Sequence, residues 1–195
     1  LLMLVAQAKE AAEWFMQAAI DADVILPIHR TLRQQMENII LIGMPGSGKS
    51  TVGKLLAART GKKFVDADEE LIGFSGRSIP DIFEKDGEAV FRRLETQVLT
   101  NLGQQSGIIL ATGGGCVTQA GNYPLLHQNG TIFCIERALD QLPTEGRPLS
   151  QATKMEEMYR IRKPLYKAFA DHMIDNNGSA DSAACQILLI LEGTT

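Results

Sequence analysis

The sequence predicts an α/β fold of three layers (α/β/α), in which helices cover both faces of a five-stranded parallel sheet. Two observations lead to this prediction. Five short apolar runs recur along the chain, as expected for strands that are buried on both faces. Helical patterns separate these runs, and such alternation favours parallel strands joined by right-handed crossovers. One additional helix is expected before the first strand.

The expected strands are short, and the first is the clearest because it contains only isoleucine and leucine. In chain order the strands are expected at residues 39–42, 63–65, 108–111, 131–135 and 172–174. The helices between and after them are expected at residues 49–59, 79–85, 88–103, 151–170 and 180–192. Ser78 can cap the helix that contains Asp81, and Gly87 separates that helix from the next.

The first 36 residues do not follow this alternation, so the chain is divided into an extension (1–36) and a main domain (37–195). Residues 1–20 predict a helix with one apolar stripe, formed by Leu4, Ala8, Ala11, Phe15 and Ala18. Residues 21–37 are expected to be a connector with one short helical piece, in which Pro27 ends helical structure.

Composition excludes several classes of protein. The formal net charge is −4, which argues against a nucleic-acid partner or a membrane surface, because both need a basic face. The three cysteines, Cys116, Cys134 and Cys185, form no CxxC pair, so a zinc site is not expected. No stretch of about 20 apolar residues is present. We therefore expect a cytoplasmic protein.

The strongest motif is the phosphate loop, residues 43–51, with the sequence GMPGSGKST. It matches G-x-x-x-x-G-K-[ST] and lies between an apolar strand and a helix, which is the context that this motif requires. Its glycines allow several backbone N–H groups to face one anion at a helix N-terminus. Lys49 can reach the β- and γ-phosphates of a nucleotide, and Ser50 can offer an oxygen to Mg²⁺.

Two carboxylates, Asp66 and Asp68, follow the second strand. If the segment stays extended, both side chains point to the same side. One could then hold magnesium, and the other could accept the proton of an attacking hydroxyl. The alternative is a purely structural role, in which acidic residues begin a helix.

Two further groups are candidates for substrate binding. Arg92 and Glu95 are three residues apart on one helix, so Arg92 could clamp a carboxylate while Glu95 orients it. A solvated ion pair is the alternative. The glycine turn, residues 113–115, follows the third strand and allows close approach of the backbone to a ligand.

Taken in order, these segments resemble the shikimate kinase family. The matching text is GMPGSGKST (43–51), FVDAD (64–68), DIFEKDGEAVFRRLE (81–95), ATGGG (111–115), GRPL (146–149) and RKPLY (162–166). The resemblance covers residues 38 to 192 and implies the P-loop fold of nucleoside-monophosphate kinases. It also implies ATP- and Mg²⁺-dependent phosphorylation of the 3-hydroxyl of shikimate.

The resemblance also implies roles for individual residues. The ATP-binding residues would be Gly46, Ser47, Gly48, Lys49, Ser50, Thr51 and the lid residue Arg147. Ser50 and Asp66 would hold Mg²⁺. Shikimate would contact Asp68, Arg92, Gly113, Gly114, Gly115 and Arg162. Lys49, Asp68 and Arg147 would carry the catalysis.

Two segments depart from the family pattern. The region that should form the mobile lid, about residues 138–153, is short and contains Pro143. The segment around Arg162 matches the family, and there Pro164 is expected to kink or end the helix at residues 151–170, which favours a binding role for Arg162. The start of the chain, around Gln7, resembles the C-terminal helix of shikimate dehydrogenase. We therefore expect the extension to pack on a dehydrogenase domain or on a neighbouring chain.

Two other functions remain open from the residues alone. One is a kinase for a different small hydroxy acid, such as a gluconate-type kinase. The other is a regulatory protein that binds a nucleotide without transferring its phosphate. A GTPase-like switch is not expected, because the chain contains no N-K-x-D motif.

Overall fold

A computed structural model describes residues 1–142 and 149–193 of the chain, the side chains of residues 149–154 excepted. Its centre is a sheet of five parallel strands in the order β2-β3-β1-β4-β5. The strands are β1 (Asn38–Ile42), β2 (Lys63–Asp66), β3 (Ile108–Ala111), β4 (Gly130–Glu136) and β5 (His172–Asp175). The predicted three-layer α/β fold is confirmed, and each expected strand is present within about one residue of its predicted bounds.

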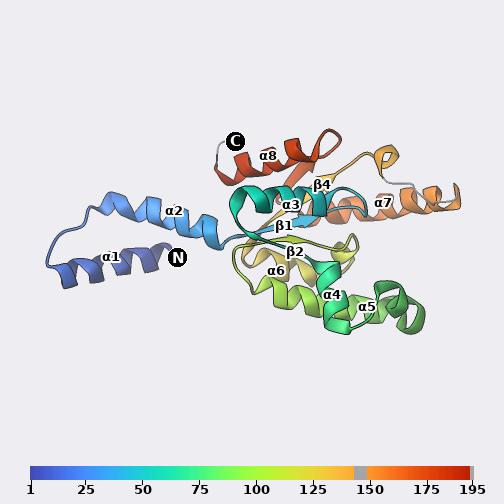
Figure 1. Cartoon of the computed structure of the whole chain (residues 1–195), viewed down its shortest axis with the longest axis horizontal. Coiled ribbons are helices and arrows are strands. Elements are labelled where there is room, and N and C mark those ends of the chain that lie inside the picture. Colours follow the sequence, from blue (N-terminus) through green and yellow to red (C-terminus); the bar gives the residue numbers. More distant parts are fainter. Residues whose placement is uncertain (143–148, 194–195) are drawn as a thin grey trace.

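Helices cover both faces of this sheet (Figure 1). On one face lie α3 (Lys49–Thr60) and α8 (Ala180–Leu191), which pack against each other. The other face carries α5 (Ile79–Gly103), α6 (Asn122–His127) and α7 (Leu149–Phe169). The short helix α4 (Ala67–Ser75) follows β2 and packs on α5.

The alternation of side chains along β1 divides the core into two halves. Ile39 and Leu41 pack with the residues of α3 and α8. Ile40 and Ile42 pack on the opposite side, with α5 and α7. Successive side chains of a strand point to opposite faces, and both faces are covered here, so every residue of β1 is buried.

The strand order creates a switch point beside β1. From β1 the chain moves outward to β2 and returns to β3, and it then crosses to β4 and β5 on the other side. In open sheets of this kind, ligands bind at the carboxyl ends of the strands where the order reverses. The phosphate loop begins at this point, because it directly follows β1.

Local signals set several helix boundaries as expected. The Ser78 hydroxyl accepts a hydrogen bond from the Asp81 N–H and caps α5. Gly87 has φ 77° and ψ 174°, which breaks α5 into the two predicted segments. A positive φ of this kind suits glycine because glycine has no Cβ.

The structure differs from the expected local structure in three places. Pro27 does not end a helix, because it lies in the first turn of α2 (Ile25–Met36), where its missing N–H needs no partner. The connector at residues 21–37 is therefore mostly helical. Pro164 was expected to kink or end its helix, and of these two outcomes the end is excluded, since α7 continues to Phe169. The short helix α6 was not expected at all.

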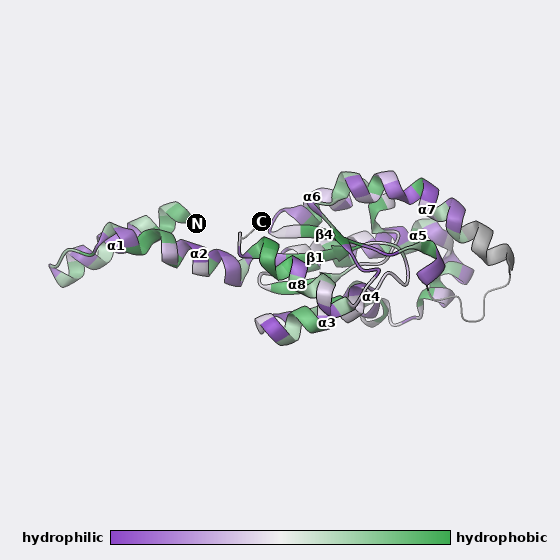
Figure 2. Ribbon diagram, turned by 90° about the horizontal axis from the view of Figure 1, so that it is seen from above, coloured by the Kyte–Doolittle hydropathy of each residue, from purple (hydrophilic) through white to green (hydrophobic). Residues whose placement is uncertain are grey.

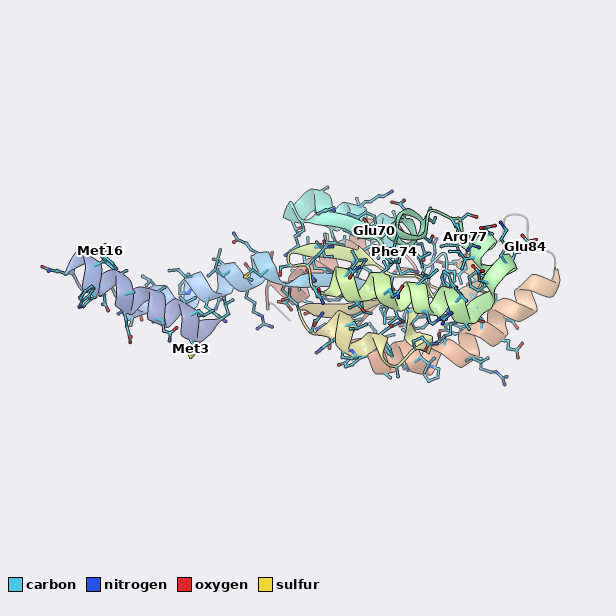
Figure 3. The ribbon with its side chains drawn as sticks, turned by 90° about the horizontal axis from the view of Figure 1, so that it is seen from below. Met3, Met16, Glu70, Phe74, Arg77 and Glu84 are labelled. Carbon is cyan, nitrogen blue, oxygen red and sulfur yellow. The ribbon has the colours of Figure 1, made fainter. Side chains whose placement is uncertain are left out.

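The extension forms a pair of helices, α1 (Leu2–Met16) and α2, that projects from the sheet (Figure 2). In α1 only Val5 is buried, whereas Trp14 is 80% and Phe15 is 82% exposed. Figure 3 shows Met3 and Met16 on α1, far from the sheet. The predicted apolar stripe is thus largely exposed to solvent.

The end of α2 is fixed to the sheet by hydrogen bonds to its carbonyl groups. The Gly107 N–H donates to Met36 O over 2.8 Å. Lys62 Nζ donates to Gln35 O over 2.9 Å and to Glu37 O over 2.8 Å. Within the described residues, no helix is long and apolar enough to cross a membrane.

Candidate active site

The phosphate loop connects β1 to α3, and its shape depends on glycine. Gly43, Gly46 and Gly48 all have positive φ angles, 142°, 79° and 97°. A Cβ atom on Gly43 would lie 2.5 Å from Ile135 O, and one on Gly48 would lie 2.4 Å from the Asn176 side chain. Both distances are too short for any other residue, so the loop packs tightly on the ends of β4 and β5.

Lys49 is the first residue of α3 and is 9% exposed. Its Nζ donates to the carbonyl oxygens of Gly43 and Met44, each over 3.0 Å. Burial lowers the pKa of Lys49, while the charges of Asp68 and Asp66 act in the opposite direction. The ammonium group therefore lies over the phosphate loop, beside two carboxylates.

Asp66 connects the phosphate loop to α4. Its Oδ2 accepts a hydrogen bond from Ser50 Oγ over 2.8 Å, and its Oδ1 accepts one from the Asp68 N–H over 3.0 Å. Asp66 is thus the N-cap of α4, and Asp68 lies in the first turn of that helix. The expected extended segment was wrong. The structural alternative, in which acidic residues begin a helix, is confirmed, and the roles in magnesium binding and proton transfer stay predictions.

Asp68 has an unusual electrostatic environment. Burial raises the pKa of its carboxyl group, and the charge of Asp66 raises this pKa further, against the opposing effects of Lys49 and Arg92. A carboxylate with a raised pKa is a better proton acceptor than an ordinary aspartate.

The glycine turn brings these groups together. A Cβ atom on Gly113 would lie 2.9 Å from both Asp68 Oδ1 and Glu95 Oε1. A Cβ atom on Gly115 would lie 2.3 Å from Arg92 Nη2, and one on Gly114 would lie 2.7 Å from the ring of Pro45 in the phosphate loop. Any side chain in this turn would displace a charged group or the phosphate loop.

Arg92 lies on α5 and is held by two carboxylates. Its Nη1 donates to Glu95 Oε2 over 2.7 Å, and its Nη2 donates to Glu88 Oε1 over 3.0 Å. The Arg92 and Glu95 side chains are only 11% and 4% exposed, so they do not form a solvated surface pair. Burial raises the pKa of Glu95, and the bond from Arg92 opposes this effect.

Arg162 reaches the same turn from α7. Its Nη1 donates to Gly114 O over 3.1 Å. The Tyr166 hydroxyl, one helical turn later, donates to the same oxygen and also contacts Met44 Sδ. The two arginines expected to bind a carboxylate therefore approach the glycine turn from two different helices.

Two residues near the site were missed by the sequence analysis. Tyr166 belongs to the RKPLY segment but received no role. Asn176 directly follows β5, and its Nδ2 donates to Ser47 O over 2.7 Å. The rule that sites lie at the carboxyl ends of strands predicts a contact at this position, because Asn176 follows the last strand.

Not every candidate residue can be placed. Arg147 lies outside the described residues, as do all of residues 143–148 of the expected lid segment. Thr51 lies in the first turn of α3 and is exposed. The remaining candidates lie at the carboxyl end of the sheet, near the points where β1, β2 and β3 end.

Comparison with known sequences agrees with this geometry. The sequence model of the shikimate kinase family matches residues 45–192. A shikimate kinase of Nitrosomonas europaea is 42% identical over 161 residues, which cover 78% of this chain and 76% of that protein. One of Acinetobacter baumannii is 39% identical over 168 residues, which cover 81% of this chain and 93% of that protein.

Solved structures give the same result. A shikimate kinase from Acinetobacter baumannii in complex with shikimate superposes with a TM-score of 0.77 at 37% identity, covering 85% of this chain and 98% of that one. A shikimate kinase from Aquifex aeolicus gives a TM-score of 0.71 at 36% identity, covering 80% and 97%. Fold, sequence and site geometry therefore agree, and the chain belongs to the shikimate kinase family.

Proposed function

We propose that the chain transfers the terminal phosphate of ATP to the 3-hydroxyl of shikimate, giving shikimate 3-phosphate and ADP. The observation that carries this proposal is the position of Arg92 and Arg162. Both contact the glycine turn, which itself packs on the phosphate loop through Pro45. Two guanidinium groups beside a phosphate site suit an acceptor that carries both a carboxylate and a hydroxyl.

ATP would bind to the phosphate loop. The phosphate loop leads into the N-terminus of α3, which begins at Lys49, and the helix dipole favours an anion there. The ammonium group of Lys49 would exchange its two carbonyl partners for phosphate oxygens. Arg147 would cover the transferring phosphate from the lid.

The residues present also fit Mg²⁺. Ser50 Oγ and Asp66 Oδ2 are 2.8 Å apart and supply the hydroxyl and carboxylate oxygens that this ion prefers. When bound, Mg²⁺ would neutralise charge on the phosphates, which usually provide its other ligands. Asp66 is also fixed by the Asp68 N–H, so its carboxylate does not have to be ordered on binding.

The acceptor would lie between Asp68 and the two arginines. Asp68 takes the proton of the attacking hydroxyl, for which its raised pKa suits it. Arg92 and Arg162 bind the carboxylate, and Glu95 holds Arg92 in place. The glycine turn leaves room for the ring, because it contributes no side chains. Phosphoryl transfer depends mostly on such alignment and on charge neutralisation.

A direct assay tests this function. Purified protein is mixed with ATP and Mg²⁺, and ADP release is followed with shikimate and with a panel of other hydroxy acids, including gluconate. We expect turnover with shikimate, and mass spectrometry should find one added phosphate. Turnover only with another acid would identify a different kinase. ADP binding without any transfer would identify a regulatory protein.

We also propose that residues 1–36 are a separate extension of the domain at 37–195. The family model begins after this segment, and its helices α1 and α2 contact each other more than the sheet. Its apolar side chains, including Trp14 and Phe15, are exposed. Such a surface would pack on a dehydrogenase domain or on a neighbouring chain.

Sedimentation velocity tests the role of the extension. We expect the protein either to self-associate or to bind a separately prepared shikimate dehydrogenase. Replacing Trp14 and Phe15 by serine should abolish this association. Phe74→Ser is the matched control, because Phe74 is also exposed but lies on α4 (Figure 3). A monomer that binds no dehydrogenase would contradict the proposal.

A further inference from the structure

Asn176 is a buried polar residue for which the proposed reaction gives no role. It is 3% exposed and lies one residue beyond β5. Its backbone N–H donates to Glu136 O over 2.8 Å, which fixes it to the end of β4. Its side chain therefore starts from a rigid position.

The Asn176 side chain holds one peptide group of the phosphate loop. Its Nδ2 donates to Ser47 O over 2.7 Å. The peptide that joins Ser47 to Gly48 is planar and trans, so its N–H points away from its C=O. A carbonyl that is held toward Asn176 therefore turns the Gly48 N–H in the opposite direction. Among the described residues, the Gly48 N–H donates to no protein acceptor.

The same contact explains a constraint at Gly48. A Cβ atom there would lie 2.4 Å from Asn176 Nδ2, so the amide fills the space that a side chain would need. Gly48 also has φ 97°, a conformation that strongly favours glycine. The glycine and the asparagine thus form one unit at the start of α3.

A comparison with Asn38 separates this role from ordinary core packing. Asn38 is 1% exposed and uses both ends of its amide, donating to Gln105 O over 2.7 Å and accepting from the Ile108 N–H over 3.0 Å. Asn176 uses only its Nδ2, and its buried Oδ1 has no partner among the described residues. Among the described residues, the only side-chain hydrogen bond of Asn176 is therefore the one that holds Ser47 O, whereas Asn38 joins two segments.

We infer that Asn176 is a positioning residue for the nucleotide: its amide orients the Ser47–Gly48 peptide so that the Gly48 N–H faces the bound phosphate. This inference rests on the proposed function, because it assumes that the phosphate loop binds a nucleotide. It assigns Asn176 no contact with the acceptor. Loss of the amide should therefore weaken nucleotide binding and leave shikimate binding unchanged.

Calorimetric titration of ADP tests the inference without requiring turnover. Asn176→Asp keeps the shape of the side chain but replaces the donor by a charged acceptor. Asn176→Leu has a similar volume and removes the donor without adding charge. Each variant should bind ADP about tenfold more weakly than the wild-type protein, as expected for the loss of an orienting hydrogen bond. The KM for ATP should rise in parallel, and the KM for shikimate should stay within about twofold.

The control is Asn38→Asp, which disrupts the hydrogen bonds of another buried amide, at the N-terminal end of β1. It should lower the melting temperature but change ADP affinity by less than about twofold. If both Asn176 variants fail to fold, Asn176→Ser leaves only a gap and should show the same selective loss. A folded Asn176→Leu or Asn176→Ser protein that binds ADP like the wild type would overturn the inference. A wild-type protein that binds no ADP would instead overturn the proposed function.

Discussion

Lys49 and Lys62 make almost the same contacts at opposite ends of the parallel strands. Lys49 Nζ donates to two carbonyl oxygens of the phosphate loop, each over 3.0 Å. Lys62 Nζ donates to two carbonyl oxygens at the end of α2, over 2.9 and 2.8 Å. Burial lowers the pKa of both lysines. By their hydrogen bonds alone, the two residues cannot be distinguished.

Their surroundings differ completely. Lys49 lies at a helix N-terminus, next to backbone N–H groups and the carboxylates of Asp66 and Asp68. Lys62 lies at the C-terminal end of α2, where a positive charge stabilises the helix dipole. A lysine that binds two carbonyl groups therefore indicates a phosphate site only where backbone N–H groups and carboxylates surround it. The following predictions test that difference, from the largest effect to the smallest.

Lys49→Ala should have the largest effect on activity. Without the ammonium group, the charge that develops on the transferring phosphate is not neutralised, and kcat should fall by about 1,000-fold or more. Circular dichroism should show an unchanged fold. The kinetic measurement is ADP release at saturating shikimate. Turnover like that of the wild-type protein would refute the assigned role of Lys49.

Asp68→Asn should lower kcat by about 100-fold or more, because the proton acceptor is lost. It should also raise the melting temperature at pH 7. Burial raises the pKa of the Asp68 carboxyl group in the folded protein, so the folded chain binds a proton at this group more readily than the unfolded chain does. Its stabilising contribution is therefore present at low pH and is lost as the pH rises through the folded pKa. Asparagine does not ionise, so the variant keeps this stability at neutral pH.

The difference in melting temperature between Asp68→Asn and the wild type should be greatest at neutral pH. It should shrink as the pH falls toward 4, since the wild-type carboxyl group then becomes protonated as well. Thermal melts between about pH 4 and pH 8 measure this trend. A difference that grows on acidification would show that the sign of the pKa shift is wrong.

Arg92→Ala should raise the KM for shikimate by about tenfold or more, and it should affect the KM for ATP much less. The reason is that Arg92 contacts the glycine turn and is held there by Glu95. Arg93→Ala is the matched control, because Arg93 is the next residue on α5 and is exposed. Equal increases in both KM values would indicate that Arg92 has only a structural role.

Lys62→Ala should have the smallest effect on catalysis. We expect kcat and both KM values to match those of the wild type, because Lys62 lies at the start of β2, at the end of the sheet opposite the phosphate loop. The melting temperature should fall by about 2 to 4 °C, since two carbonyl groups at the end of α2 lose their donor. A large loss of turnover would show that the two ends of the sheet are coupled, and the comparison of the two lysines would fail.

The sequence predicts the sheet well because its strands are continuous apolar runs with covered faces, as Ile39–Ile42 illustrates. It also predicts the phosphate loop, because glycines are needed there at fixed positions. Helix boundaries at prolines were harder. Pro27 and Pro164 both lie inside helices, since the local rule depends on which N–H group is lost and on how the helix packs.

Side-chain geometry at the site could be predicted only in part. Arg92 and Glu95 were expected to share a face, and they do because both lie on one helix. The extended arrangement of Asp66 and Asp68 was wrong, because α4 begins between them. Asn176 was missed because its contact with Ser47 joins residues that are 129 positions apart. The rule that sites lie at the carboxyl ends of strands points to this position, but no local pattern identifies Ser47 as its partner.

The position of Asn176 has a consequence for the order of events during synthesis. Ribosomes make the phosphate loop early, but Asn176 emerges only after β5, the last strand along the described chain. A nascent chain that ends before this residue therefore lacks the amide that holds Ser47 O. Tight nucleotide binding would then begin only when the whole sheet is available, so a nucleotide would stabilise finished molecules and not incomplete ones.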